Sequence, residues 1–292
     1  MRNAIYRLRM TTLIITLIVP CLYAQKATDP IIYADVPDKI TAQNPLIQTI
    51  YTADPAPIVF GDTLFLYVGH DEDDAHKDPH GGYLMREYRL FTTTDMVNWT
   101  DHGAPLKIGQ ISWSTNDASA AQLIERNGKY YWYFSTGNKN DQGVAVGVAV
   151  SDSHYGPFKD AIGKALITNS MTTYAPHFWD NLDPTVFIDD DGQAYLFWGN
   201  AACYWVKLNK DMISIDGEIH ALDIKDKTAF AGTYTEAPWV YKRNKQYYII
   251  YAAEFPENIS YSTSKKNYRA LETTGHTNAY GKRQHHQSLR HY

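Results

Sequence analysis

The sequence predicts an all-β protein with the architecture of a β-propeller, on three observations. Four segments share one plan: a short apolar strand, a tight turn and a second strand rich in aromatic residues. The turns recur about every 53 to 67 residues, an interval long enough for a whole blade. Helical periodicity is almost absent, and radially repeated sheets of about four strands are typical of propellers. A β-sandwich with coincidental spacing is the alternative.

Each of the repeated segments contains a hairpin. The segments cover residues 56–67, 122–133, 184–198 and 238–250. An Asn-Gly pair at 127–128 and an Asp-Gly pair at 191–192 mark two of the turns, because glycine accepts the positive φ that such turns require. Further strand-like runs fill the intervals between hairpins, for example at 143–150 and 203–208. Residues 25–264 are therefore predicted to form the propeller domain.

Residues 1–24 have the pattern of an export signal. Three arginines precede an apolar run over residues 10–21, and the Leu-Tyr-Ala sequence at 22–24 offers a cleavage site. The run is too short for a comfortable membrane span. We therefore expect a secreted or periplasmic protein. A lipoprotein anchor at Cys21 is the poorer interpretation, because the Ile-Val-Pro before it matches such an anchor badly.

The predicted mature chain is mildly acidic and has one cysteine. Cleavage after residue 24 leaves 24 Lys and Arg against 32 Asp and Glu, a formal charge of −8. This balance argues against nucleic acid or an anionic membrane as a partner. Cys203 then has no second cysteine to pair with, so no intrachain disulfide is expected. We expect a monomer.

An acidic residue stands at the start of three of the four repeats, shortly before a proline. The motifs are Ala-Asp-Pro-Ala-Pro, Leu-Asp-Pro-Thr and Thr-Glu-Ala-Pro-Trp, and their acids are Asp54, Asp183 and Glu236. The first strand of each blade lines the channel of a propeller, so equivalent positions should converge at one mouth. The following proline favours an extended backbone at the acid. Each acid alone is also consistent with a turn residue, whereas three at equivalent positions predict a shared site.

Three converging carboxyl groups can carry out glycoside cleavage. One acid protonates the leaving oxygen, and one carboxylate activates water or attacks carbon. A third can raise the pKa of its neighbour by charge repulsion and orient it. Aromatic faces also suit sugar rings, and core packing is an equal interpretation for each of the three candidate tryptophans, Trp113, Trp179 and Trp239.

The sequence resembles glycoside hydrolase family 43 from about residue 44 to residue 264. The motifs that carry the resemblance are Ala-Asp-Pro-Ala-Pro at 53–57, Trp-Asp-Asn-Leu-Asp-Pro-Thr at 179–185, which continues to Asp-Asp-Asp-Gly at 189–192, and Thr-Glu-Ala-Pro-Trp at 235–239. The run Ser-Asp-Ser-His-Tyr-Gly-Pro-Phe at 151–158 is similar to that family's blade-closing signature. The resemblance implies a five-bladed β-propeller and hydrolysis with inversion.

The resemblance also implies a role for each acid. Asp54 would be the general base, Glu236 the general acid, and Asp183 the residue that tunes and orients the acid. With Gly-His-Asp-Glu at 69–72, the pattern looks most like members that act on arabinoxylan and xylo-oligosaccharides. We expect an exo-acting enzyme on such a polysaccharide or oligosaccharide that releases α-L-arabinofuranose. A β-xylosidase is the close alternative, and an inactive propeller that only binds carbohydrate is the alternative of another class.

No metal site is predicted from the residues. The His- and acid-rich segment 70–80 matches no standard ligand spacing and is interpreted as a solvated loop. The Asp-Asp-Asp-Gly run at 189–192 is explained by its hairpin turn and does not have the spacing of an EF-hand. The resemblance allows a calcium ion in the channel, but we expect no required cofactor.

Residues 265–292 break the repeat pattern, since they contain no Val, Ile, Phe or Trp. Only about four blades are then encoded, where the resemblance implies five. One extra adenine in an A-rich run at the codons for 265–267 could explain this, because the shifted frame can spell an apolar run with Gly-Pro-Trp. We therefore hypothesise a frameshifted chain with an aberrant, disordered tail, and expect poor stability and little activity.

Overall fold

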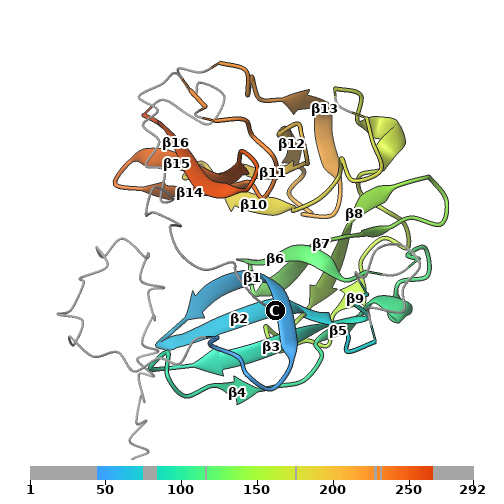
Figure 1. Cartoon of the computed structure of the whole chain (residues 1–292), viewed down its shortest axis with the longest axis vertical. Coiled ribbons are helices and arrows are strands. Elements are labelled where there is room, and N and C mark those ends of the chain that lie inside the picture. The colour runs from blue at the N-terminus through green and yellow to red at the C-terminus, as the bar shows by residue number, and fades with distance from the viewer. Residues whose placement is uncertain are drawn as a thin grey trace, which may run out of the picture. The chain divides into compact units, whose positions relative to one another are not determined.

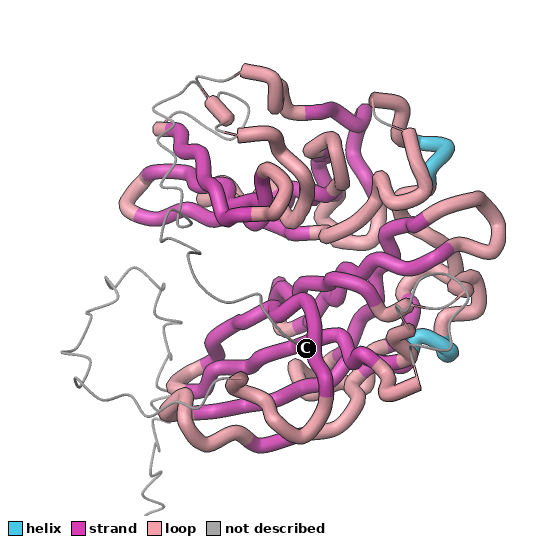
Figure 2. The backbone as a smooth tube through the Cα atoms, viewed as in Figure 1, coloured by secondary structure: helices cyan, strands magenta, loops and turns pink. Residues whose placement is uncertain are grey.

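The computed structural model describes residues 45–74, 84–115, 117–174, 176–226, 229–230 and 232–265. These residues form four antiparallel sheets, the blades of a β-propeller (Figure 1). Most of the regular structure in the described residues is strand, and the helical segments there are two short 3-10 turns, Ile108–Gln110 and Asn169–Met171 (Figure 2). The predicted all-β propeller is thereby confirmed with four blades. The five-bladed ring stays a prediction, and the predicted signal at 1–24 and tail from 266 onward lie outside the described residues.

Blades 1 and 2 are built from consecutive strands. Blade 1 contains β1 (Tyr51–Phe60), β2 (Thr63–Asp71), β3 (Glu87–Thr93) and β4 (Thr100–Asp101), and β5 (Leu106–Lys107) also pairs with β3. Blade 2 contains β6 (Ser119–Arg126), β7 (Lys129–Gly137), β8 (Val144–Ser151) and β9 (Lys159–Asp160). Consecutive strands from β1 to β4 and from β6 to β9 are antiparallel neighbours, and the hairpins β1–β2 and β6–β7 need only short turns.

Blades 3 and 4 follow the same plan. Blade 3 contains β10 (Thr185–Ile188), β11 (Ala194–Trp198), β12 (Tyr204–Leu208) and β13 (Ile215–Ala221). Blade 4 has three strands within the described residues, β14 (Trp239–Arg243), β15 (Gln246–Ala253) and β16 (Asn258–Ser264). Among these residues, no helix has the length and apolarity needed to cross a membrane.

The hairpin turns have the backbone that their sequences predict. Asn127 and Gly128 have φ values of 55° and 76°, as a two-residue turn with both central residues left-handed requires. Gly192, at a φ of 81°, lies in a longer turn closed by its N–H to the carbonyl of Asp189. These turns fix the register of each hairpin, and so they fix the position of the first strand of the blade and of the residue at which it begins.

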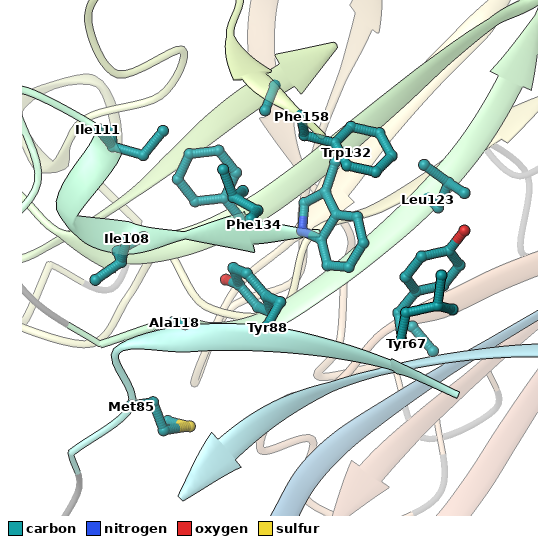
Figure 3. Close-up of a cluster of buried hydrophobic side chains, with 14 of the residues drawn as sticks. Tyr67, Met85, Tyr88, Ile108, Ile111, Ala118, Leu123, Trp132, Phe134 and Phe158 are labelled. Carbon is teal, nitrogen blue, oxygen red and sulfur yellow. The ribbon is translucent and has the colours of Figure 1, made fainter. Parts of the chain in front are cut away.

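The blades pack through aromatic side chains at their interfaces. Trp132 of β7 is fully buried, with Tyr67 of β2 in an edge-to-face contact at 4.7 Å between ring centroids (Figure 3). Tyr88 of β3 packs against the same indole and donates a hydrogen bond to the carbonyl of Ser119 on β6. Rings that fill a core and also have a polar end suit this role. These aromatic side chains therefore serve the contact between blades 1 and 2.

Contacts between the inner strands continue from blade to blade. Strands β1 and β2 contact β6, and β10 contacts both β6 and β14. Gln122 of β6 reinforces one of these interfaces, because its buried Oε1 accepts hydrogen bonds from the Thr185 hydroxyl and the Val186 N–H of β10. The start of each inner strand is thus held next to that of its neighbour, which is where the predicted acids lie.

Candidate active site

The three acids predicted from the sequence line one pocket. This pocket has a volume of about 230 Å³, and Asp54, Asp183 and Glu236 are in its wall. All four blades contribute to it, and the remaining lining residues are Pro55, Ala120, Ala121, Pro184, Ala237, Pro238 and Trp239. Hollows of about 390 Å³ lie beside Trp99 and Trp205 on other surfaces, but they do not bring together acids from several blades.

Two of the acids occupy the same position in their blades, and the third stands one residue earlier. In each of these blades one residue pairs across the sheet just before the proline of the motif. Ala53 pairs with Gly69 of β2 in blade 1, the carbonyl of Leu182 accepts from the Gly199 N–H in blade 3, and the carbonyl of Glu236 accepts from the Ala252 N–H in blade 4. Asp54 and Asp183 directly follow that point, whereas Glu236 is at it. The sequence pattern, which treated the three as equivalent, was therefore wrong by one residue for Glu236.

The residue before each proline has a left-handed backbone. The φ values are 53° at Asp54, 59° at Asp183 and 55° at Ala237. The extended backbone predicted for the acids was wrong for Asp54 and Asp183, because Asp tolerates the left-handed region and tertiary contacts hold it there. Left-handed residues other than glycine cost free energy and cluster where a fold fixes a functional group. The strain recurs in three blades at the pocket wall.

Asp183 is the acid most strongly perturbed by its surroundings. Its Oδ2 accepts a 2.8 Å hydrogen bond from the Ala237 N–H, and its own N–H donates to the Ser135 hydroxyl at 3.1 Å. Burial raises the pKa of Asp183 well above its usual value, and the charges of Glu236 and Asp54 raise it further, against the opposing bond from Ala237. This carboxyl group therefore retains a proton to higher pH than an ordinary aspartate.

Glu236 is held by a side-chain amide. Its Oε2 accepts a 2.7 Å hydrogen bond from Nδ2 of Asn200. Burial raises the pKa of Glu236, the bond from Asn200 lowers it, and the charges of Glu257 and Asp54 raise it, with a net rise. A raised pKa suits a group that must carry a proton before it can donate one.

Asp54 faces the same pocket from blade 1 and keeps access to solvent. Burial by the surrounding residues raises the pKa of Asp54, the charge of Asp71 adds to the rise, and a hydrogen bond from the Ala120 backbone opposes it. Because the three carboxyl groups repel one another when ionised, the site favours a state in which some of them are protonated while another is ionised. Such a site can protonate one atom of a substrate and deprotonate a water molecule.

The structure places the three predicted tryptophans differently. Trp239 is half-buried and lines the pocket, where it also packs against the core of blades 1 and 2. Trp179 is 40% exposed on the segment before β10, edge-to-face with Phe178 at 4.8 Å, and does not line the pocket. Trp113 is buried, stacks on Phe134 and donates to Asp160, which corresponds to the core-packing interpretation.

The segments considered for metal binding have other contacts or are not described. Asp189 accepts hydrogen bonds from Nζ of Lys242 at 3.0 Å and from the Tyr247 hydroxyl at 2.8 Å, and so ties blade 3 to blade 4. Within the described residues, no group of three His, Cys, Asp or Glu side chains is arranged to hold an ion. Residues 75–83 of the His-rich segment lie outside the described residues.

Sequence reasoning missed Asn200 and Ser135, which hold two of the acids. Asn200 lies in the turn after β11 and Ser135 near the end of β7, and both bond to acids that are distant in the chain. Neither has a local motif that could have singled it out. A polar residue at the end of an otherwise buried strand was the one available signal, as in Trp-Gly-Asn at 198–200.

Comparison with known proteins agrees with this geometry. The model of the family "Glycosyl hydrolases family 43" matches residues 42–290. The chain belongs to this family. The resemblance to the family, which rested on the three acid motifs, is thereby confirmed. This family 43 protein is a glycosidase by descent.

Several family 43 relatives are similar over most of this chain. Xylosidase/arabinosidase 43A of Humicola insolens is 31% identical over 260 residues, which cover 71% of this chain and 74% of the relative. An arabinoxylan arabinofuranohydrolase of Paenibacillus polymyxa is 31% identical over 264 residues, 81% of this chain and 39% of the relative. This chain thus spans well under half the length of the second relative.

Solved structures of the family share the fold. An α-L-arabinofuranosidase from Clostridium thermocellum is 34% identical, with a TM-score of 0.61 over 78% of this chain and 71% of that one. A β-xylosidase/α-arabinofuranosidase from a compost metagenome, solved with xylotriose, is 26% identical, with a TM-score of 0.63 over 77% of both chains. The four described blades therefore match those of known family 43 enzymes.

Proposed function

We propose that this chain is an inverting, exo-acting glycoside hydrolase, which releases α-L-arabinofuranose from arabinoxylan or xylo-oligosaccharides. The observation that carries the proposal is the convergence of Asp54, Asp183 and Glu236, from three blades, on one small pocket. Its volume of about 230 Å³ suits the removal of single sugars better than the binding of a long chain. The activities named for the relatives, xylosidase/arabinosidase and arabinoxylan arabinofuranohydrolase, support the substrate class.

In this mechanism the three acids divide the proton transfers. Asp54, ionised, takes a proton from a water molecule, whose oxygen attacks the anomeric carbon from one face. The bond to the leaving oxygen breaks on the other face as Glu236 gives that oxygen its proton. Asp183 and Glu236 repel each other, so together they keep a proton to higher pH than either would alone. The reaction requires only water and these carboxyl groups.

The stereochemistry of the first product tests the mechanism. We expect proton NMR of a digest of 4-nitrophenyl α-L-arabinofuranoside to show β-L-arabinofuranose before mutarotation. First appearance of the α-anomer would overturn inversion. Xylosidase activity is the second candidate, because the names of the Humicola relative and of the metagenome structure include both sugars. The ratio of kcat/KM on the arabinofuranoside and on 4-nitrophenyl β-D-xyloside decides between the two.

The location and the complete ring of this enzyme are also proposals. The basic and apolar pattern of residues 1–24 supports export to the periplasm or the medium. The acid motifs support a ring of five blades through their resemblance to the family. N-terminal sequencing of the secreted protein should begin at Gln25, and a start at Met1 would contradict cleavage.

A further inference from the structure

The turn between β11 and β12, residues 199–202, has an unusual backbone. Gly199 has a φ of 126°, and an added Cβ there would lie 2.1 Å from the carbonyl oxygen of Ala202. Ala201 has a φ of 59°, in the left-handed region. Only glycine fits the first position, and the second is strained. The backbone of Asn200, which lies between them, is therefore closely fixed.

The main chain of this turn bonds to the segment that carries Asp183. The N–H of Gly199 donates to the carbonyl of Leu182 at 2.8 Å, and the N–H of Asn200 donates to the carbonyl of Asp180 at 3.3 Å. Asp180 is fully buried, so its segment is well enclosed. The turn is thus fixed to the strand start of its own blade.

The same turn bonds to the segment that carries Glu236 in the next blade. The N–H of Ala201 donates to the carbonyl of Thr235 at 2.7 Å. The buried Tyr234 hydroxyl donates to the carbonyl of Gly199, also at 2.7 Å. One bond therefore holds the main chain directly before Glu236 and the other holds the Tyr234 side chain, so the turn links the starts of blades 3 and 4.

The side chain and carbonyl of Asn200 complete the arrangement. Nδ2 donates to Oε2 of Glu236 at 2.7 Å, and the carbonyl of Asn200 accepts from Nε2 of His177 at 3.1 Å. The Trp179 N–H donates to Nδ1 of His177, so the proton of the neutral ring is on Nε2. Asn200 is thus bonded both at its main-chain carbonyl and at its side-chain amide.

We propose that Asn200 is a positioning residue, which holds the Glu236 carboxyl group in the orientation needed to protonate the leaving oxygen. The inference rests on the proposed role of Glu236 as general acid. With Oε2 engaged by the amide, Oε1 carries the transferable proton. The N–H donor also favours the ionised product of the transfer, so it stabilises charge that develops as the proton leaves.

Titration of Glu236 tests this role without any need for turnover. We would label the full chain with glutamate carrying ¹³C at the carboxyl carbon, and assign the Glu236 signal from its loss in Glu236→Gln. The charged or titratable groups that act on or with Glu236 are Asp54, Asp183, Tyr234 and Glu257. All four remain in Asn200→Ala, so a shift of the signal does not come from the loss of a charged group.

We expect the pKa of Glu236 to rise in Asn200→Ala, because the donor that favours the ionised form is gone. It should rise further in Asn200→Asp, where an ionised neighbour repels the carboxylate. The matched control is Asn209→Ala, which removes an amide that bonds Ser214 and Ile215 in another turn of the same blade. An unshifted or lowered pKa of Glu236 in Asn200→Ala would overturn the inference.

Kinetics give the second readout. For Asn200→Ala we expect kcat/KM to fall roughly 10-fold on arabino-xylo-oligosaccharides, part of the effect of a general acid, and to fall far less on 4-nitrophenyl glycosides. KM should change little. Equal losses on both substrates would overturn the positioning role. If Glu236→Ala itself showed no dependence on the leaving group, the proposed function would fail instead, and the two failures are thereby distinguished.

Discussion

The main-chain N–H of Ala237 donates a 2.8 Å hydrogen bond to Oδ2 of Asp183, from blade 4 to blade 3. Ala237 directly follows Glu236, so the residue next to one acid is bonded to the side chain of another. The left-handed backbone of Ala237, with a φ of 55°, accompanies this bond. A strained residue therefore sets the relative position of two carboxyl groups.

Replacing Ala237 with glycine should relieve that strain and keep the donor. A left-handed L-residue costs about 1–2 kcal/mol, and the greater freedom of glycine in the unfolded chain offsets roughly 0.5–1 kcal/mol. We expect Ala237→Gly to raise the free energy of unfolding in urea by up to about 1 kcal/mol. The control Ala194→Gly, at a fully buried position in β11, should lower it by about 1 kcal/mol or more. Equal losses in both variants would contradict the strain.

Asp54 and Glu236 should differ in how their loss depends on the leaving group. Asp54→Ala should reduce kcat/KM by about 10²–10⁴-fold on every substrate, because the attacking water loses its base. Glu236→Ala should reduce kcat/KM by a similar factor only on natural glycosides, because a nitrophenolate leaves with little need of a proton. Steady-state kinetics on an arabino-xylo-oligosaccharide and a nitrophenyl glycoside measure both effects. The assignment fails if the two variants lose the same factor on both substrates.

The acidic limb of the pH profile of kcat/KM should depend on the charge of Asp71. Its charge helps to raise the pKa of Asp54, and the base must be ionised to act. Asp71→Asn should therefore lower the pKa of Asp54 and move the acidic limb of kcat/KM to lower pH. Asp73→Asn, two residues further along, provides the control. A limb that moves equally in both variants would show a general effect of net charge rather than the local one.

Asp183 should reduce stability at neutral pH. Its raised pKa means that the folded chain binds the proton more tightly than the unfolded chain does. Stability is then lost as pH rises from the unfolded pKa of about 3.9 through the folded value. We expect Asp183→Asn to raise the Tm at neutral pH, to leave it unchanged below the unfolded pKa, and to reduce activity.

The control for that experiment is Asp152→Asn. Asp152 is exposed beside Lys129, whose charge and hydrogen bond lower the pKa of Asp152. The sign is opposite, so this substitution should not raise the Tm at either pH. A rise in both variants at neutral pH would point to the overall charge instead of burial at Asp183.

Two of the tryptophans should separate stability from binding. Trp113→Ala removes a buried ring and should cost about 3–5 kcal/mol of unfolding free energy. Trp179→Ala removes an exposed ring, so we expect a change within about 0.5 kcal/mol and a KM raised roughly 2- to 10-fold on oligosaccharides. Urea denaturation and steady-state kinetics measure the two effects. An unchanged KM in Trp179→Ala would remove this residue from the sugar-binding set.

The sequence predicted what depends on local chemistry and repetition. The Asn-Gly turn at 127–128, the blade repeat and the three acids could be found because each has a short motif. The one-residue offset of Glu236 is visible in its motif, where Ala237 stands between the acid and the proline. The left-handed backbone at Asp54 could not be found, because proline after an acid gives the opposite local preference. Asn200 could not be assigned either, since its partner is 36 residues away.

The pocket wall comes from four separate sheets, so turnover requires all four blades to be packed together at once. Suppose that one blade separates from its neighbour while its own hairpins persist. The pocket cannot persist in that case, because Asp54, Asp183 and Glu236 belong to three different blades and Ala120 to the fourth. Activity should therefore disappear at lower denaturant concentrations than the spectroscopic signal of the strands. In this protein, activity should be lost when the blades separate, before the strands within each blade unfold.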